Sequence, residues 1–243
     1  EWLSEGKEHW RPSVINFTRN WLKEGLIDRA VTRDLEWGIE IPREGYESKR
    51  MYVWFEAVMG YYSASVHWAK NQGKPDEWKK WWESEESEHY YFMAKDNIPF
   101  HTIIWPAMLS GCGYKLPYDV PANEYLLLDS SQFSKSRRHA IWIPDYLDRY
   151  DPELLRFYLA AIMPEQKDAN FTWEDYVTRI NTELIGNYGN LFYRVMSFAH
   201  KNYPDGLHSD STPIPSLNEK IIETQKRVSA ALEACKFKKA LQA

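Results

Sequence analysis

Hydrophobic positions in the first 110 residues follow two alternating patterns. Apolar residues recur at helical spacing over residues 8–23, 57–70, 76–82 and 100–110. Gly25 and Gly111 stand where the first and last of these helices would end, and Asp76 is placed to cap the third. Continuous apolar runs, typical of strands covered on both faces, occupy residues 51–55 and 89–94, and 123–128 could add a further strand. Because strands and helices alternate, this part is predicted to be α/β, with a parallel sheet and crossover helices.

The pattern changes in the last hundred residues. A polar loop at 129–139 is followed by helical spacing over residues 153–163, 173–202 and 217–243, with breaks at 204–206 and 211–215. Strand signals are not found after Pro144. The last third is therefore predicted to be an all-helical module.

Composition narrows the classes of protein to consider. A net charge of −5 argues against a protein that grips nucleic acid over its whole surface, and no DNA partner is predicted. Cys112 and Cys235 stand far apart without other clustered ligands, so neither a disulfide framework nor a metal site is expected.

No apolar run is long enough for a membrane span and no signal peptide is evident, so we expect a cytoplasmic protein without a membrane partner. The chain opens on Glu1, and its last predicted helix reaches Ala243 without a stop signal, so we expect it to be part of a longer protein.

The loop at residues 132–137, QFSKSR, is the first candidate for chemistry. Ser134 and Ser136 flank Lys135, and Arg137 follows. An ammonium group with neighbouring hydroxyls suits a polyphosphate whose charge grows during displacement. A solvated basic loop is the alternative, since no glycine-rich cradle accompanies the lysine.

A second candidate follows the predicted strand at 89–94. Residues 94–101, AKDNIPFH, lie where ligands bind in open α/β sheets, at the carboxyl end of a strand. Asp96 could accept hydrogen bonds from a ribose or an amine, while Asn97 and His101 would share one face of the next helix. The alternative is that Asp96 or Asn97 only caps that helix.

A third candidate is aromatic. It combines side chains at the end of the predicted strand at 51–55 with two positions four apart on the helix at 100–110: Trp54, Ala57, Val58, Tyr61, His101 and Trp105. Together they would form an aromatic pocket with two polar tips. Ordinary core packing is the alternative.

A fourth candidate lies in the helical module. Gly186, Asn190 and Arg194 share one face at helical spacing. Amide and guanidinium groups suit the edges of unpaired bases. A solvated helix face is the alternative.

Taken in order, these segments resemble one family. They are HWRP at 9–12, VTRDL at 31–35, YVWFEAVMGY at 52–61, FMAKDNIPFH at 92–101, FSKSR at 133–137, YDPELLRFY at 150–158, Asn181 and GNLFYR at 189–194. Their order and spacing resemble the methionyl-tRNA synthetases, which are class I aminoacyl-tRNA synthetases. The resemblance covers nearly the whole chain.

The resemblance implies a reaction in two steps. ATP, with Mg²⁺ expected, first activates methionine to methionyl-adenylate, and the methionyl group is then transferred to tRNA(Met). It places Lys135, with Ser134 and Ser136, in the catalytic KMSKS loop. It implies ATP contacts by Ala94, Lys95, Asp96, Gln132 and Lys135. It implies a methionine pocket of Trp54, Ala57, Val58, Tyr61, Asn97, His101 and Trp105, and anticodon contacts by Asn190 and Arg194.

The resemblance also implies an organisation into three regions. Residues 1–128 would be the second half of a Rossmann-like catalytic domain, 129–165 the KMSKS loop and stem-contact region, and 166–243 the start of an α-helical anticodon-binding bundle. The family's HIGH motif and zinc-bearing insertion belong upstream and do not occur here. Alone, the chain is therefore expected not to activate methionine.

Several positions depart from the family's pattern. Gln132 replaces the first Lys of KMSKS, Arg138 and Ala94 stand at glycine positions, Glu56 replaces Asp, and Gly186 stands where a base-contacting Asn is expected. Phe133 in place of Met is a familiar variant. These departures and the absent HIGH segment motivate an alternative function, a non-catalytic tRNA-binding or interaction module derived from a synthetase. A synthetase for leucine or isoleucine is a third possibility, against which the Tyr61 and His101 pair favours a sulfur-bearing substrate.

Overall fold

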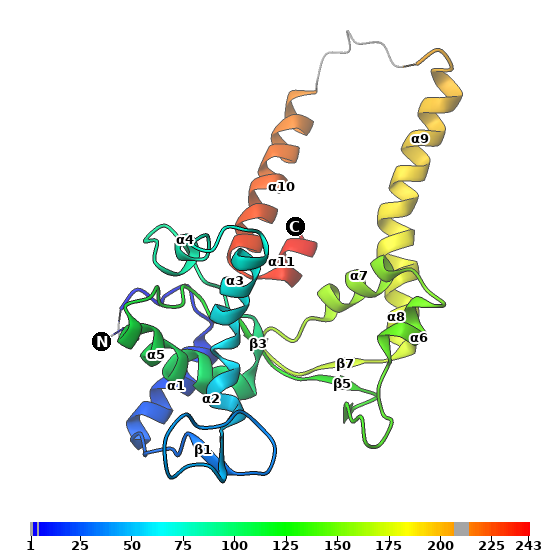
Figure 1. The fold of residues 1–243 in the computed structure, drawn as a ribbon. Coiled ribbons are helices and arrows are strands. Elements are labelled where there is room, and N and C mark those ends of the chain that lie inside the picture. The colour runs from blue at the N-terminus through cyan, green and yellow to red at the C-terminus, as the bar shows by residue number, and fades with distance from the viewer. Residues whose placement is uncertain (1, 4, 207–213) are drawn as a thin grey trace. The chain divides into compact units, whose positions relative to one another are not determined.

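The chain folds into two compact units, Glu1–Asn123 and Glu124–Ala243. They are seen in a computed structural model that describes residues 2–3, 5–206 and 214–243 (Figure 1). Part of the predicted break at 211–215 lies outside these residues. In the described parts of the chain, no helix has the length and apolar character needed to cross a membrane. The functional roles given to regions 1–128, 129–165 and 166–243 stay predictions.

The first unit mixes short strands with helices. Its elements are α1 (Pro12–Glu24), β1 (Thr32–Asp34), β2 (Lys49–Met51), α2 (Val53–Ala57), α3 (Gly60–Asn71), α4 (Lys79–Trp82), β3 (Met93–Ala94), the 3₁₀ turn η1 (Lys95–Asn97), the π-helical turn η2 (Phe100–Ile104), α5 (Trp105–Cys112) and β4 (Ala122–Asn123). β1 and β2 pair antiparallel, whereas β3 and β4 pair parallel. Since η1, η2 and α5 connect β3 to β4, this part is a parallel crossover, and the predicted α/β class is confirmed.

The segment before α1 fastens this crossover. The Trp10 indole N–H donates to the carbonyl oxygen of Tyr118 at 2.6 Å, and Arg11 Nη1 donates to that of Ala122 at 2.6 Å and to Asn123 Oδ1 at 2.7 Å. Trp10 is buried with Val14 of α1 against Val120. The HWRP segment therefore holds the strand that ends at Asn123.

Three local predictions for this unit were wrong. The run at 51–55 is not a buried strand, because β2 ends at Met51 and α2 begins at Val53, which is 55% exposed. Asp76 does not cap α4 but pairs with Lys79 at 2.7 Å, while the N-cap residue is Trp78. The helix predicted to stop before Gly111 ends at Cys112 instead, and Gly113 follows as its C-cap with a φ of 70°, which favours glycine.

The second unit places a small sheet beside long helices. Its elements are β5 (Leu126–Leu128), β6 (Ser131–Gln132), α6 (Ile143–Leu147), α7 (Pro152–Ile162), β7 (Ala169–Phe171), α8 (Trp173–Arg179), the π-helix η3 (Ile180–Gly189), α9 (Asn190–Asn202), α10 (Pro215–Glu233) and α11 (Phe237–Leu241). β5 pairs antiparallel with β6 and parallel with β7. The prediction that strands vanish after Pro144 was wrong, because β7 is a three-residue strand formed by pairing with β5.

Aromatic side chains make the core of the second unit. Tyr146, Tyr158, Phe171 and Tyr176 are buried together. The Tyr146 and Tyr176 hydroxyls hydrogen-bond to each other at 2.7 Å, and the Tyr158 hydroxyl donates to Asp175 Oδ2 at 2.8 Å. Each polar tip in this core therefore has a partner.

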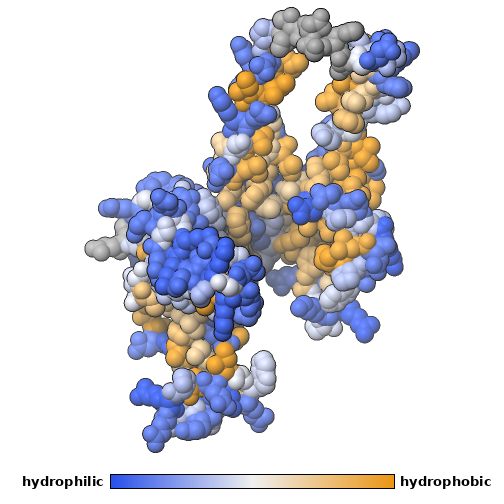
Figure 2. Space-filling model, turned by 45° about the horizontal axis from the view of Figure 1, so that its top comes forward, coloured by the Kyte–Doolittle hydropathy of each residue, from blue (hydrophilic) through white to orange (hydrophobic). Residues whose placement is uncertain are grey.

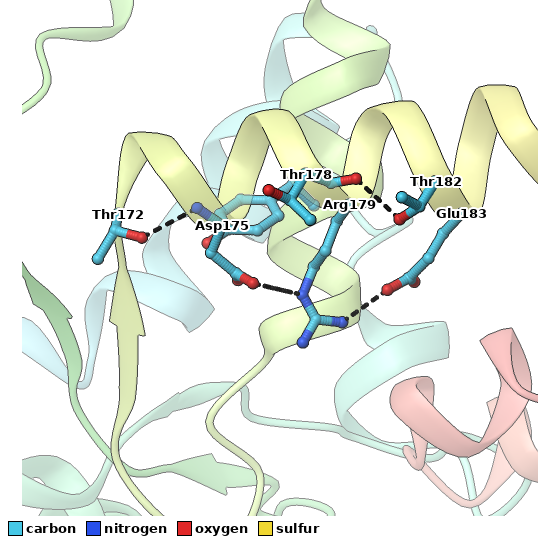
Figure 3. Close-up of polar contacts among 7 residues, drawn as sticks. Thr172, Asp175, Thr178, Arg179, Thr182 and Glu183 are labelled. Carbon is cyan, nitrogen blue, oxygen red and sulfur yellow. Dashed lines mark hydrogen bonds and ion pairs between the residues drawn. The ribbon is translucent and has the colours of Figure 1, made fainter.

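Side-chain contacts also fix the first turns of the long helix that α8, η3 and α9 form together (Figure 3). The Thr172 hydroxyl caps α8 by accepting from the Asp175 amide at 3.1 Å. Arg179 links Asp175 to Glu183, with both ion pairs at 3.0 Å. Figure 2 shows hydrophobic surface along the long helices of this unit, where Leu191, Phe192, Val195, Met196 and Phe198 of α9 are more than half exposed.

Gly186 lies at a close approach inside η3. A Cβ on Gly186 would stand 2.9 Å from the carbonyl oxygen of Asn181, whereas a Cβ on Gly189 would meet Leu184 O at an ordinary 3.5 Å. The wide winding of η3 therefore gives a structural reason for glycine where a base-contacting Asn was expected.

These two glycines make a matched pair for a stability test. We expect Gly186→Ala to lower the free energy of unfolding by about 1–3 kcal/mol, because the methyl group collides with backbone. Gly189→Ala should instead be neutral or stabilise by up to about 1 kcal/mol, as alanine does in open helical sites. Urea unfolding of both variants measures this, and equal effects would show that the π-helical winding does not depend on Gly186.

Candidate active site

A hydrogen-bonded histidine lies at the centre of the aromatic candidate site. His101 is 5% exposed in η2. Its Nδ1 lies 2.9 Å from the carbonyl oxygen of Asn97, and its Nε2 lies 2.9 Å from the Tyr61 hydroxyl of α3. A carbonyl oxygen only accepts, so Nδ1 carries the hydrogen; in the neutral ring Nε2 then accepts from the Tyr61 hydroxyl.

Burial keeps both members of this pair uncharged. It lowers the pKa of His101 below the usual range, and it raises the pKa of the Tyr61 hydroxyl. Neutral His101 is the form whose two nitrogens match the partners present. The pair therefore presents a fixed, uncharged polar tip.

Aromatic rings surround this tip. The ring centroid of Tyr61 lies 5.6 Å from that of His101 and 6.5 Å from that of Trp105. Trp54 stacks on Phe100 with ring centroids 5.6 Å apart. These distances are typical of stacked and edge-on aromatic pairs. The structure thus brings together residues from α2, α3, η2 and α5.

The predicted pocket residues divide into a buried floor and an exposed rim. Val58 and Trp105 are each 3% exposed, whereas Trp54 is 47% and Tyr61 43% exposed, and Ala57 is also exposed. Asn97 contributes its carbonyl to His101 and is half-buried. Val58 and Trp105 belong to a hydrophobic core cluster, whereas the rings of Trp54 and Tyr61 are open to solvent.

Sequence reasoning missed two neighbours of this group. Tyr91 is buried and accepts a hydrogen bond from the Trp105 indole at 2.9 Å, and Phe100 stacks on Trp54. Phe100 adjoins His101 in a motif that had been singled out, so adjacency could have found it. Tyr91 lies in a short apolar stretch, and nothing in its spacing indicates the indole contact.

Three of the five predicted ATP-contacting residues lie at the end of β3. Ala94 ends this strand, and Lys95 and Asp96 form η1 with Asn97. The N-cap residues of η1 and η2 are Ala94 and Pro99, so neither Asp96 nor Asn97 occupies an N-cap position. The placement at the carboxyl end of a parallel strand agrees with the sequence argument.

The basic loop is built from two successive tight turns. Asp129 and Ser130 have φ of 46° and 65° and connect β5 to β6, as a two-residue hairpin requires. Ser134 then pairs with His139 through backbone hydrogen bonds of 2.9 and 3.0 Å. Lys135 is therefore presented at an exposed tip.

The two serines beside Lys135 stabilise this tip. Ser134 Oγ accepts from the Arg137 amide at 3.3 Å and lies 3.3 Å from Ser136 Oγ. Arg138 has a φ of 54°, in the left-handed region that favours glycine, which gives a backbone reason for the glycine of the family pattern. Gln132 belongs to β6 and is exposed.

The helical candidates lie on α9. Asn190 and Arg194 are both exposed and four residues apart on this helix, so they share a face, while Gly186 belongs to the π-helical η3. Exposure fits both a base-contacting face and a solvated one.

Two further observations concern charge. Within the described residues, no three His, Cys, Asp or Glu side chains gather as a metal-binding group.

The described residues include one buried side-chain oxygen without a hydrogen-bond partner, Glu56 Oε2. Glu56 is two positions from both Trp54 and Val58, so α2 turns it away from the face those residues share.

The buried histidine predicts a pH dependence of stability. The pKa of His101 is lowered in the fold, so its stabilising contribution is complete above the unfolded value of about 6.5 and is lost as the pH falls through the folded value. The free energy of unfolding should therefore decrease as the pH is lowered below about 6.5. His101→Gln should reduce this slope and the exposed His67→Gln should not; equal slopes in the two variants would contradict the assignment.

Comparison with known proteins adds a family to this geometry. A family model described as tRNA synthetases class I (M) matches residues 1–196. The methionine-tRNA ligase of Dehalococcoides mccartyi is 58% identical over 194 residues, which are 79% of this chain and 35% of the relative. That of Roseiflexus castenholzii is 47% identical over 253 residues, covering 99% of this chain and 42% of the relative. The chain thus spans less than half the length of these relatives.

Solved structures share the fold. Methionyl-tRNA synthetase of Mycobacterium tuberculosis, solved with methionyl-adenylate bound, matches with a TM-score of 0.77 at 23% identity, over 96% of this chain and 45% of the other. The apo form of that enzyme matches with a TM-score of 0.74. The family model covers most of the chain, and both of these relatives are named methionine-tRNA ligases. The chain therefore belongs to the class I tRNA synthetases, in the methionyl (M) family.

Proposed function

We propose that this chain is part of a methionine-tRNA ligase, which activates methionine with ATP and transfers it to tRNA(Met). A methionine carboxylate oxygen would attack the α-phosphorus of ATP, forming methionyl-adenylate and releasing pyrophosphate. A terminal ribose hydroxyl of the tRNA would then attack the carbonyl carbon, releasing AMP. The observation that supports this most strongly is the Tyr61–His101 hydrogen bond inside a ring of aromatic side chains.

The aromatic site has the chemistry that a methionine side chain requires. A thioether is polarisable and a weak hydrogen-bond acceptor, and contact with aromatic rings stabilises it by about 0.3–1.5 kcal/mol. Trp54, Val58 and Trp105 would provide the apolar contacts, with Ala57 and Asn97 completing the site. Tyr61 and His101 would provide the polar tip. An uncharged tip suits a neutral thioether because it leaves no buried charge without a counter-charge.

The nucleotide would be held by Ala94, Lys95, Asp96, Gln132 and Lys135. Asp96 would accept from the ribose, and Lys135 at the exposed tip of its loop would stabilise the charge that develops on pyrophosphate as it leaves. Ser134 and Ser136 would support this step by keeping the turn in shape. Mg²⁺ stays an expectation for the nucleotide, and no step proposed here passes through a protein-bound metal.

The tRNA would meet the second unit. Asn190 and Arg194 offer amide and guanidinium donors on the exposed face of α9, which suits the edges of unpaired anticodon bases. The 166–243 region would accordingly begin the anticodon-binding bundle, and translation in the cytoplasm would be the setting.

A non-catalytic tRNA-binding or interaction module is the second candidate. Gln132 removes a positive charge from the phosphate end, and Ala94 adds a methyl group beside the nucleotide. Such a module would retain the helical unit and lose affinity for ATP. The two functions differ in whether the protein uses ATP at all.

Lys135 provides the direct test of the catalytic function. In the protein at the full length of its relatives, Lys135→Ala should slow methionine-dependent pyrophosphate exchange by a factor equivalent to about 2–4 kcal/mol, because one charge donor to the leaving group is lost. Lys167→Ala, at another exposed lysine, is the matched control and should leave the rate unchanged. An undiminished rate for Lys135→Ala would remove the role given to this loop.

A further inference from the structure

Tyr91 touches three members of the aromatic site without belonging to the residues assigned above. Its hydroxyl accepts from the Trp105 indole N–H at 2.9 Å. Its ring lies edge-on to Tyr61, with centroids 5.1 Å apart, and tilted against His101 at 5.6 Å. Tyr91 is 6% exposed and is therefore buried among these neighbours.

The Tyr91 hydroxyl has an acceptor of its own. It lies 3.4 Å from His89 Nδ1, and His89 Nε2 lies 2.7 Å from the carbonyl oxygen of Trp81. The carbonyl only accepts, so Nε2 carries the imidazole hydrogen and Nδ1 is the acceptor in the neutral ring. The two histidines near this site therefore hold opposite tautomers.

Burial maintains these protonation states. It raises the pKa of Tyr91 to about 12 and lowers that of His89 below the usual histidine range. A neutral Tyr91 hydroxyl can accept from Trp105 and donate toward His89 at the same time. The result is a chain of contacts from Trp105 through Tyr91 and His89 to the Trp81 carbonyl of α4.

We propose that Tyr91 is a positioning residue that holds Trp105, Tyr61 and His101 in the arrangement that receives the methionine side chain. The inference rests on the proposed function, because it concerns the same site. Trp105 is 3% exposed, so removing the Tyr91 oxygen would leave its buried indole N–H without the acceptor it has now. A buried donor without a partner is costly, and the indole would turn to find another acceptor. Turning it would change the shape of the site floor.

Removing the Tyr91 hydroxyl should weaken the binding of methionine and leave the binding of ATP unchanged. Tyr91 contacts residues assigned to the methionine site, whereas the residues assigned to ATP lie at the end of β3 and in the basic loop. Replacing Tyr91 with Phe keeps the ring packing and removes only the oxygen. A general loss of stability would weaken both substrates, so the contrast between them separates positioning from simple structural damage.

Tyr62→Phe is the matched control. Tyr62 also has a hydroxyl bonded to a side chain in this unit, at 3.2 Å from the Tyr114 hydroxyl, and burial raises its pKa to about 12 as well. Its ring packs on Trp78 and Tyr114, at 5.1 and 5.2 Å. The variant removes the same atom from the same residue type in a neighbouring environment.

The experiment measures pyrophosphate exchange with the protein at the full length of its relatives. Tyr91→Phe should raise the KM for methionine about tenfold, the loss expected for one buried hydrogen bond, and leave the KM for ATP within about twofold. The indole N–H resonance of Trp105 should move in ¹H–¹⁵N spectra of the same variant. Tyr62→Phe should leave the KM for methionine and that resonance unchanged.

Two results would overturn the inference. One is an unchanged KM for methionine in Tyr91→Phe, and the other is an equal rise in the KM values for methionine and ATP. Failure of the proposed function gives a different result, because the unsubstituted protein would then show no methionine-dependent exchange, while the Trp105 resonance would still report the Tyr91 contact.

Discussion

The candidate site depends on one constraint, a buried imidazole that must remain neutral and satisfied at both nitrogens. His101 meets it by donating from Nδ1 to the Asn97 carbonyl and accepting at Nε2 from the Tyr61 hydroxyl. Losing either partner would leave a polar atom buried without a hydrogen bond, which costs about 1–3 kcal/mol. The requirement holds the Tyr61 ring of α3 against His101 of η2.

The remaining aromatic residues extend from this pair. Trp105 has to find an acceptor for its own buried N–H, and Tyr91 provides it, so the Trp105–Tyr91 pair lies beside the His101–Tyr61 pair. Trp54 and Phe100 then stack at the rim, where solvent can reach. The arrangement combines large polarisable surfaces with uncharged donors and acceptors. That combination fits a thioether better than it fits a charged or strongly polar side chain.

Part of this group could be expected from sequence, where local spacing carries the information. His101 and Trp105 stand four positions apart, so the two residues share one side of the predicted helix. Trp54 and Tyr61 lie on separate helices, α2 and α3, and tertiary packing brings them to the same place. Tyr91 could not be found in this way, because its contact with Trp105 depends on how the chain before β3 packs on α5. The run at 51–55 was assigned to the wrong class because continuous apolar residues suit a strand and a helix equally.

Backbone geometry accounts for the other differences. The strand β7 exists through its partner β5, and three residues carry too little periodicity to reveal it. The sequence shows the π-helical winding of η3 only through the glycine at position 186. It shows the left-handed φ at position 138 only because Arg138 stands where the family pattern has glycine. Both positions had been noted as departures from a family pattern. The structure relates each of them to the local backbone.

Titration calorimetry of the protein at the full length of its relatives tests the central claim most directly. The account predicts that methionine binds and that leucine and isoleucine bind at least about tenfold more weakly, because their branched side chains lack the unbranched shape and polarisable sulfur that the aromatic site accommodates. ATP should bind to the same protein. Binding of tRNA without binding of methionine or ATP would contradict the account and identify an RNA-binding module in place of a ligase.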